Sequence, residues 1–106
     1  MAKAEIDPGI CGYHATVETR MSSDGELVDI SIQSNCPAIQ KLAHDLIQVN
    51  PFKEISSRRA VPESLQAGLK YCTHAACLVP VGIIKAIEVE AGLALPRNAS
   101  IKVSKE

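Results

Sequence analysis

The chain has 106 residues and a formal net charge of −1 at pH 7, with one phenylalanine, two tyrosines and no tryptophan. A chain of this length forms one domain, here residues 1–106, and can bury roughly two thirds of its unfolded surface without help from a metal or a disulfide. The balanced charge argues against nucleic-acid binding, and the absence of a long apolar run or a signal peptide argues against membrane contact and favours a cytoplasmic location.

Two segments in the N-terminal third alternate apolar and polar residues, as strands with one buried face do. They are residues 14–20, HATVETR, and residues 27–33, LVDISIQ. The Asp24-Gly25 pair between them is a strong hairpin signal. We therefore predict an antiparallel pair of strands with one apolar face.

Three helices are expected after the hairpin, and each begins with a proline, a residue favoured in the first helical turn. Residues 37–49 repeat apolar side chains at helical spacing, which predicts an amphipathic helix packed on the sheet. Residues 62–71 form a shorter helix with weaker periodicity. The last helix starts at Pro80 and ends at Gly92.

Residues 99–103 alternate again, with Ala99, Ile101 and Val103 on one face, and predict a third strand at the sheet edge. The expected fold is a small α+β two-layer sandwich of order ββααβ. Its antiparallel three-stranded sheet would carry the helices on one face.

Four cysteines fall at the boundaries between these elements. Cys11 precedes the first strand, Cys36 separates the second strand from its helix, and Cys72 and Cys77 separate the last two helices. An antiparallel hairpin places Cys11 and Cys36 at the same end of the sheet. Cys36 and Cys77 would stand at helix N-termini, where exposed N–H groups favour the thiolate that binds metals or attacks electrophiles. Three or four sulfurs are thus expected to converge.

The C-x4-C spacing of Cys72 and Cys77 suits a zinc ligand pair and also occurs in one iron–sulfur pattern. Cys72 is preferred as the fourth ligand because thiolates compete well for zinc or iron. His74, inside the same loop, is the alternate ligand or a hydrogen-bond donor to a coordinating sulfur.

Two other interpretations of the thiols stay open. Cys77 or Cys36 could be the activated nucleophile of a thiol-dependent enzyme or redox protein. The four thiols could also be incidental small apolar residues of an interaction module. The chain carries no C-x-x-C redox motif, carboxylate pair, glycine-rich phosphate loop or Ser/His/Asp pattern.

The segments CGYHATVETR, SNCPAIQKLA and VGIIKAIE, with a hairpin between the first two, resemble two related groups over roughly residues 9–92. One is the cysteine-bearing scaffold domain of the NifU/IscU iron–sulfur assembly family, and the other is the TSCPD domain appended to some ribonucleotide reductases. The scaffold resemblance implies zinc or a transient iron–sulfur cluster at Cys11, Cys36 and Cys77.

This chain departs from the scaffold pattern at two positions. Tyr13 stands where the scaffold family carries an acid associated with cluster release, and Cys72 is additional. We therefore expect a non-catalytic accessory or carrier protein that holds zinc or an iron–sulfur cluster at Cys11, Cys36, Cys72 and Cys77. A protein partner or a homodimer is compatible with this expectation.

Overall fold

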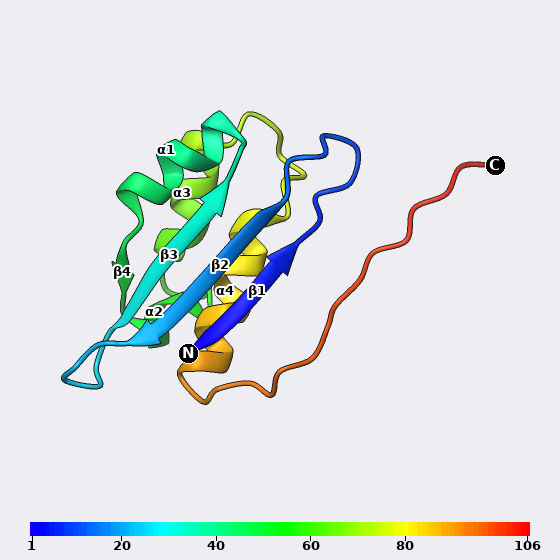
Figure 1. The fold of residues 1–106 in the computed structure, drawn as a ribbon. Helices are drawn as coiled ribbons and strands as arrows, with labels where there is room; N and C mark the ends of the chain where they lie inside the picture. The colour runs from blue at the N-terminus through cyan, green and yellow to red at the C-terminus, as the bar shows by residue number, and fades with distance from the viewer.

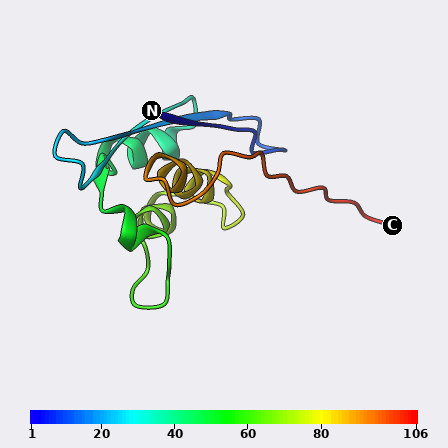
Figure 2. The same cartoon turned by 90° about the horizontal axis from the view of Figure 1, so that it is seen from below.

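The computed structural model describes all 106 residues as one α+β domain (Figure 1). The elements in chain order are β1 Ala2–Ile6, β2 Ala15–Met21, β3 Val28–Ser34, α1 Pro37–Asp45, β4 Gln48–Val49, α2 Pro51–Glu54, α3 Glu63–Tyr71 and α4 Val79–Glu90. The strands form one antiparallel sheet in the order β1-β2-β3-β4. All helices lie on one face of that sheet (Figure 2).

The predicted hairpin of β2 and β3 is confirmed. Its register pairs Ala15 with Ser34 and Met21 with Val28. At the turn, Gly25 has φ +73°, a backbone conformation that glycine adopts without steric cost. Val17 and Val28 are fully buried beneath the sheet, as the alternation requires.

The expectation of a three-stranded ββααβ sandwich is wrong. The sheet has four strands because the N-terminal segment forms β1, and residues 99–103 form no strand. β1 and β4 take the two positions directly beside the hairpin, and alternation at 99–103 was not sufficient to make that segment a strand. The tail instead leaves the domain as an exposed extended segment (Figure 1).

The predicted helix over residues 37–49 is too long. It ends at Asp45, and Gln48 and Val49 then form β4, pairing with Asp29 and Val28. Val49 is buried in this position, so sheet pairing and burial override the helical periodicity. The helices expected near 62–71 and 80–92 correspond to α3 and α4.

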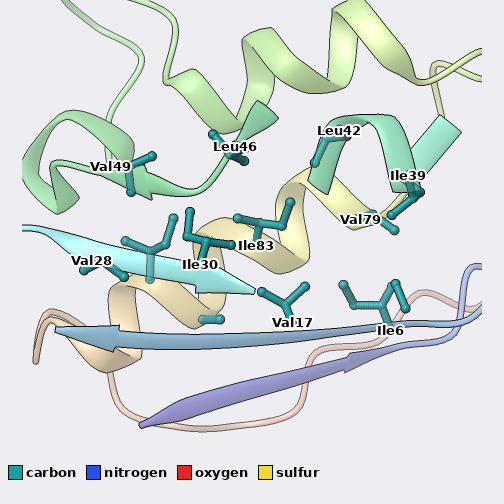
Figure 3. Packing of buried hydrophobic residues seen from close by; sticks show 13 residues of the cluster. Ile6, Val17, Val28, Ile30, Ile39, Leu42, Leu46, Val49, Val79 and Ile83 are labelled. Atoms are coloured by element: carbon teal, nitrogen blue, oxygen red, sulfur yellow. The ribbon is translucent and has the colours of Figure 1, made fainter. Parts of the chain in front are cut away.

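Helix α4 lies between the sheet and α3 and carries the centre of the core. Val79, Ile83 and Ile87 are buried on it, and Ile83 points toward the strand side chains (Figure 3). The hydroxyl of Thr19, buried on β2, donates to the carbonyl oxygen of Ala86 at 3.1 Å. This bond ties the helix backbone directly to a central strand.

Two glycines permit the close approach of α4 to its neighbours. A Cβ at Gly68 on α3 would lie 2.5 Å from Cγ of Pro80 on α4. A Cβ at Gly82 on α4 would collide with the side chain of Ile6 on β1. The close approach of α3 to α4 and that of α4 to β1 therefore both depend on glycine having no side chain.

The start of α3 is held by a buried carboxylate from α2. Glu54 is 1% exposed, and its oxygens accept hydrogen bonds from the backbone N–H of Glu63 at 2.8 Å and of Ser64 at 2.9 Å. The Ser64 hydroxyl also donates to Glu54 at 2.6 Å. These bonds satisfy N–H groups that a helix start leaves without internal partners.

We predict that Gly68→Ala destabilises the domain although alanine is the better helix former. The helix gains about 1 kcal/mol in propensity. Overpacking against the rigid Pro80 ring costs about 1–3 kcal/mol, so unfolding by urea should show a net loss of stability. Gly82→Ala is the comparison, because the atoms its Cβ meets, Cδ1 and, at 2.8 Å, Cγ1, belong to the rotatable side chain of Ile6 and not to a ring. An equal loss in both variants would contradict the proposed role of the proline ring.

Candidate functional site

Three cysteine-bearing segments meet at one end of the sheet. Ala15 pairs with both Ile6 and Ser34, so the β1–β2 loop, which holds Cys11, and the β3–α1 junction, which holds Cys36, lie at the same end. The α3–α4 connection lies at this end too (Figure 1). The prediction that the hairpin brings Cys11 and Cys36 to one end of the sheet is confirmed.

Cys36 is the residue that begins α1. Its carbonyl oxygen accepts the first helical hydrogen bond, from Gln40 N–H at 2.9 Å, and its thiol makes no capping bond. The junction is fixed by Ser34, whose hydroxyl accepts from Cys36 N–H at 3.1 Å and donates to the His14 carbonyl oxygen at 2.8 Å. The backbone is therefore anchored while the sulfur stays free of hydrogen bonds to the backbone.

Cys72 and Cys77 flank the connection between the last two helices. Cys72 ends α3, where its N–H bonds to the Gly68 carbonyl oxygen at 2.9 Å. Cys77 N–H bonds to the His74 carbonyl oxygen at 3.2 Å, which closes a turn before α4. Like Cys36, both side chains are half-buried and pack against the hydrophobic core.

The environment of Cys72 disfavours its thiolate. Burial, followed by the neighbouring Cys77 and then Cys36, raises the pKa of Cys72 to about 12. A buried thiol surrounded by apolar groups and other thiols keeps its proton because a negative charge there would be poorly solvated. Cys77 and Cys36 therefore both lie close enough to Cys72 to disfavour a negative charge on its sulfur.

Cys11 and His74 stand apart from this group. Cys11 is exposed on a turn in which Gly12 N–H bonds to the Gly9 carbonyl oxygen at 3.0 Å. His74 is exposed in the α3–α4 connection. No three or more His, Cys, Asp or Glu side chains are arranged as a preformed metal site. The structure thus brings together Cys36, Cys72 and Cys77 without the geometry of a bound ion.

Sequence reasoning missed the contact that anchors the end of α3 next to Cys72. The Tyr71 hydroxyl donates to Asp45 on α1 at 2.7 Å. This bond, followed by the nearby Lys70 ammonium, lowers the pKa of the Asp45 carboxyl group. Lys70 lies 3.7 Å from the same carboxylate and 5.1 Å from the centre of the Tyr71 ring. No sequence pattern announced this pairing across the 25 residues between Asp45 and Tyr71.

Sequence reasoning also missed a shallow polar groove of about 490 Å³ beside Cys36. Its lining includes His14, Gln33, Ser34 and Gln40. The polar faces of the two predicted strands and of the first helix were the available signal. The groove is open and polar, and no cysteine side chain lines it.

Comparison with known proteins gives one match. Residues 2–103 match a family of unknown function, DUF6951. The chain belongs to this family. No curated protein and no solved structure matches. The likeness to the scaffold and TSCPD domains therefore stays a prediction. None of the helices is long and apolar enough to span a bilayer.

We predict that the four thiols of the reduced protein react with iodoacetamide at different rates at pH 8. Cys11 should react first because it is exposed, and Cys72 last because a pKa of about 12 leaves about one thiolate in ten thousand. Peptide mass spectrometry over a time course measures the order. Cys36 and Cys77 are half-buried like Cys72, so their rates control for the effect of burial on access of the reagent to the sulfur. Labelling of Cys72 as fast as Cys11 would contradict the prediction.

Proposed function

We propose that this chain is a small metal- or iron–sulfur-binding protein that acts as a non-catalytic accessory or carrier. Cys36, Cys72 and Cys77 would supply the ligands, with Cys11 as the fourth. The observation that carries the proposal is the convergence of three half-buried thiols, contributed by separate segments, on one edge of the core.

The donor set suits a thiophilic cation. Zinc and the iron of clusters are bound by thiolates, and three or four cysteines from loops and helix ends are a common ligand set. The environment that keeps Cys72 protonated would reverse its preference once a cation offsets the negative charges. Zinc or an iron–sulfur cluster would then supply either a structural cross-link or a transferable cargo.

Cys11 is the residue that decides whether the site is closed. With four thiolates a zinc site is complete, whereas three ligands leave a position for water or another ligand. Cys11 lies between Gly9 (φ +89°) and Gly12 (φ +72°) in a turn that glycines allow to bend tightly. The exposed His74 is the competing candidate for that position.

A second function is favoured by one observation, the side-chain contact between Cys72 and Cys77. An oxidant such as oxidised glutathione could take two electrons from this pair. The two protein thiols would then form one disulfide, and the glutathione disulfide would be reduced to two glutathione thiols. The raised pKa of Cys72 opposes its use as the attacking thiolate. Metal binding is therefore the better-supported proposal. Anaerobic incubation with oxidised glutathione, followed by disulfide mapping, separates the two.

We predict that anaerobically reduced protein binds one equivalent of zinc, or assembles a cluster, and that Cys36→Ser, Cys72→Ser and Cys77→Ser each weaken binding at least tenfold, in line with loss of one ligand. Titration against a chromophoric chelator measures zinc, and visible absorption measures a cluster. The variants should remain folded by circular dichroism, because the aliphatic core does not depend on the thiols.

Substitutions of Cys11 and of two histidines define the ligand set. Cys11→Ser should weaken binding as strongly as the other three substitutions if the site is closed. His74→Ala should leave binding unchanged, as should His44→Ala, which alters an equally exposed histidine on α1. Loss of binding in His74→Ala with retention in Cys72→Ala would overturn the assignment of Cys72. No binding of either metal form would overturn the proposed function.

Metal affinity should rise with pH. Cys72 keeps its proton up to a pKa of about 12, so coordination must displace that proton throughout the usual pH range. Each displaced proton strengthens apparent binding about tenfold per pH unit. Zinc titrations at pH 6.5, 7.5 and 8.5 measure the slope, and a flat profile would show that no protonated thiol is engaged.

A further inference from the structure

The outer edge of β1 is open. β1 pairs only with β2, so one side of the strand presents backbone N–H and C=O groups to which no other strand binds. Its solvent-facing side chains include Lys3 and Glu5, which form an ion pair at 3.4 Å. Proteins usually cover or block such an edge because it can accept another strand.

The C-terminal segment has the character of a strand that lacks a sheet. Ile101 is 70% exposed and Val103 is 89% exposed, and they alternate with the polar Ser100 and Lys102. β-branched residues at every second position are typical of a half-buried strand. The family match ends at Val103, so this segment belongs to the part of the chain that the family describes.

We propose that the segment around residues 99–103 of one copy adds to the open edge of β1 in a second copy as an antiparallel strand, with residues 101–103 lying opposite β1. The exchange would be reciprocal and would give a two-fold symmetric dimer. Each copy offers one open edge and one extended segment, so a reciprocal exchange uses both and closes without free ends.

The occupant is a second copy rather than the chain's own tail. No backbone hydrogen bond involves a residue beyond Ala94, and the tail extends away from the domain (Figure 1). Residues 92–99 can span up to about 23 Å, so the linker leaves residues 99–103 room to pair away from their own domain. This inference goes beyond the proposed metal site and does not depend on it.

Charge and apolar pattern select one register. Placing Lys102 opposite Glu5 puts opposite charges on the solvent face. The same register puts Ile101 opposite Ile6 and Val103 opposite Ala4, on the face that packs on the helices. Ile6 already contacts α4 at Gly82, so the added strand would continue an apolar layer.

Sedimentation of the full chain over a range of concentrations tests the proposal. We expect a reversible monomer–dimer equilibrium whose dissociation constant rises about tenfold or more in Ile101→Asp, because an apolar side chain is lost from the interface. Ser104→Asp is the matched control. It adds the same charge on the solvent face, opposite Lys3 in this register, and should leave the dimer intact.

A charge exchange tests the register itself. Glu5→Lys and Lys102→Glu should each raise the dissociation constant about two- to tenfold, and the double variant should restore it. Amide hydrogen exchange should show protection of residues 99–103 that increases with concentration. Measuring all variants in a Cys36→Ser background without metal keeps this result separate from the metal site.

Three outcomes would overturn the proposal. The first is a monomer at every concentration with an unprotected tail, which would leave the segment for a different extended partner. The second is a dimer that survives Ile101→Asp, which would point to pairing of two β1 edges. The third is concentration-independent protection of residues 99–103 in a monomer, which would place the tail on its own sheet.

Discussion

The close packing of α4 between the sheet and α3 is the constraint on which the rest of the structure depends. Gly82 lets α4 approach β1, and Gly68 lets α3 approach Pro80 near the beginning of α4. The buried Thr19 hydroxyl then fixes the helix backbone to the central strand β2. Without these approaches the three layers could not share one core of small aliphatic side chains.

The cluster formed by Cys36, Cys72 and Cys77 follows from the same arrangement of helices. α4 begins at the end of the sheet where β3 passes into α1, so Cys77 comes near Cys36. α3 packs along α4 and ends beside the beginning of α4, so Cys72 joins them. The core is assembled by aliphatic residues alone. A metal at the edge would therefore be held by a scaffold that already exists, unlike a zinc finger, in which the metal creates the fold.

The parts of the fold that could be predicted are those in which local chemistry and tertiary packing agree. Asp24-Gly25 defined the hairpin, and element boundaries located the cysteines. β1 was missed because alanine has low strand propensity, so its alternation with Lys3 and Glu5 is weak. The end of α1 was missed because pairing with β3 captures Gln48 and Val49. The tail was assigned to the sheet because alternation shows that a segment can form a strand but not whether it pairs with an edge of its own sheet.

The candidate site was predicted in composition but not in detail. The hairpin rule brought Cys11 and Cys36 to one end, yet it could not show that Cys11 lies on an exposed turn outside the half-buried group. Nor could spacing reveal that Tyr71 would bind Asp45, since that contact depends on how two helices cross. Long-range packing decides such details, and a single sequence carries little information about it.

The carboxylate of Glu54 has a consequence for the segment that follows it. By binding the start of α3, it brings together the two ends of the exposed loop 55–61, so the geometry of the junction does not depend on the loop's own sequence. Doubling the length of a flexible loop costs only about 0.6 kcal/mol in closure entropy. This loop is therefore a site where an epitope or reporter peptide can be grafted.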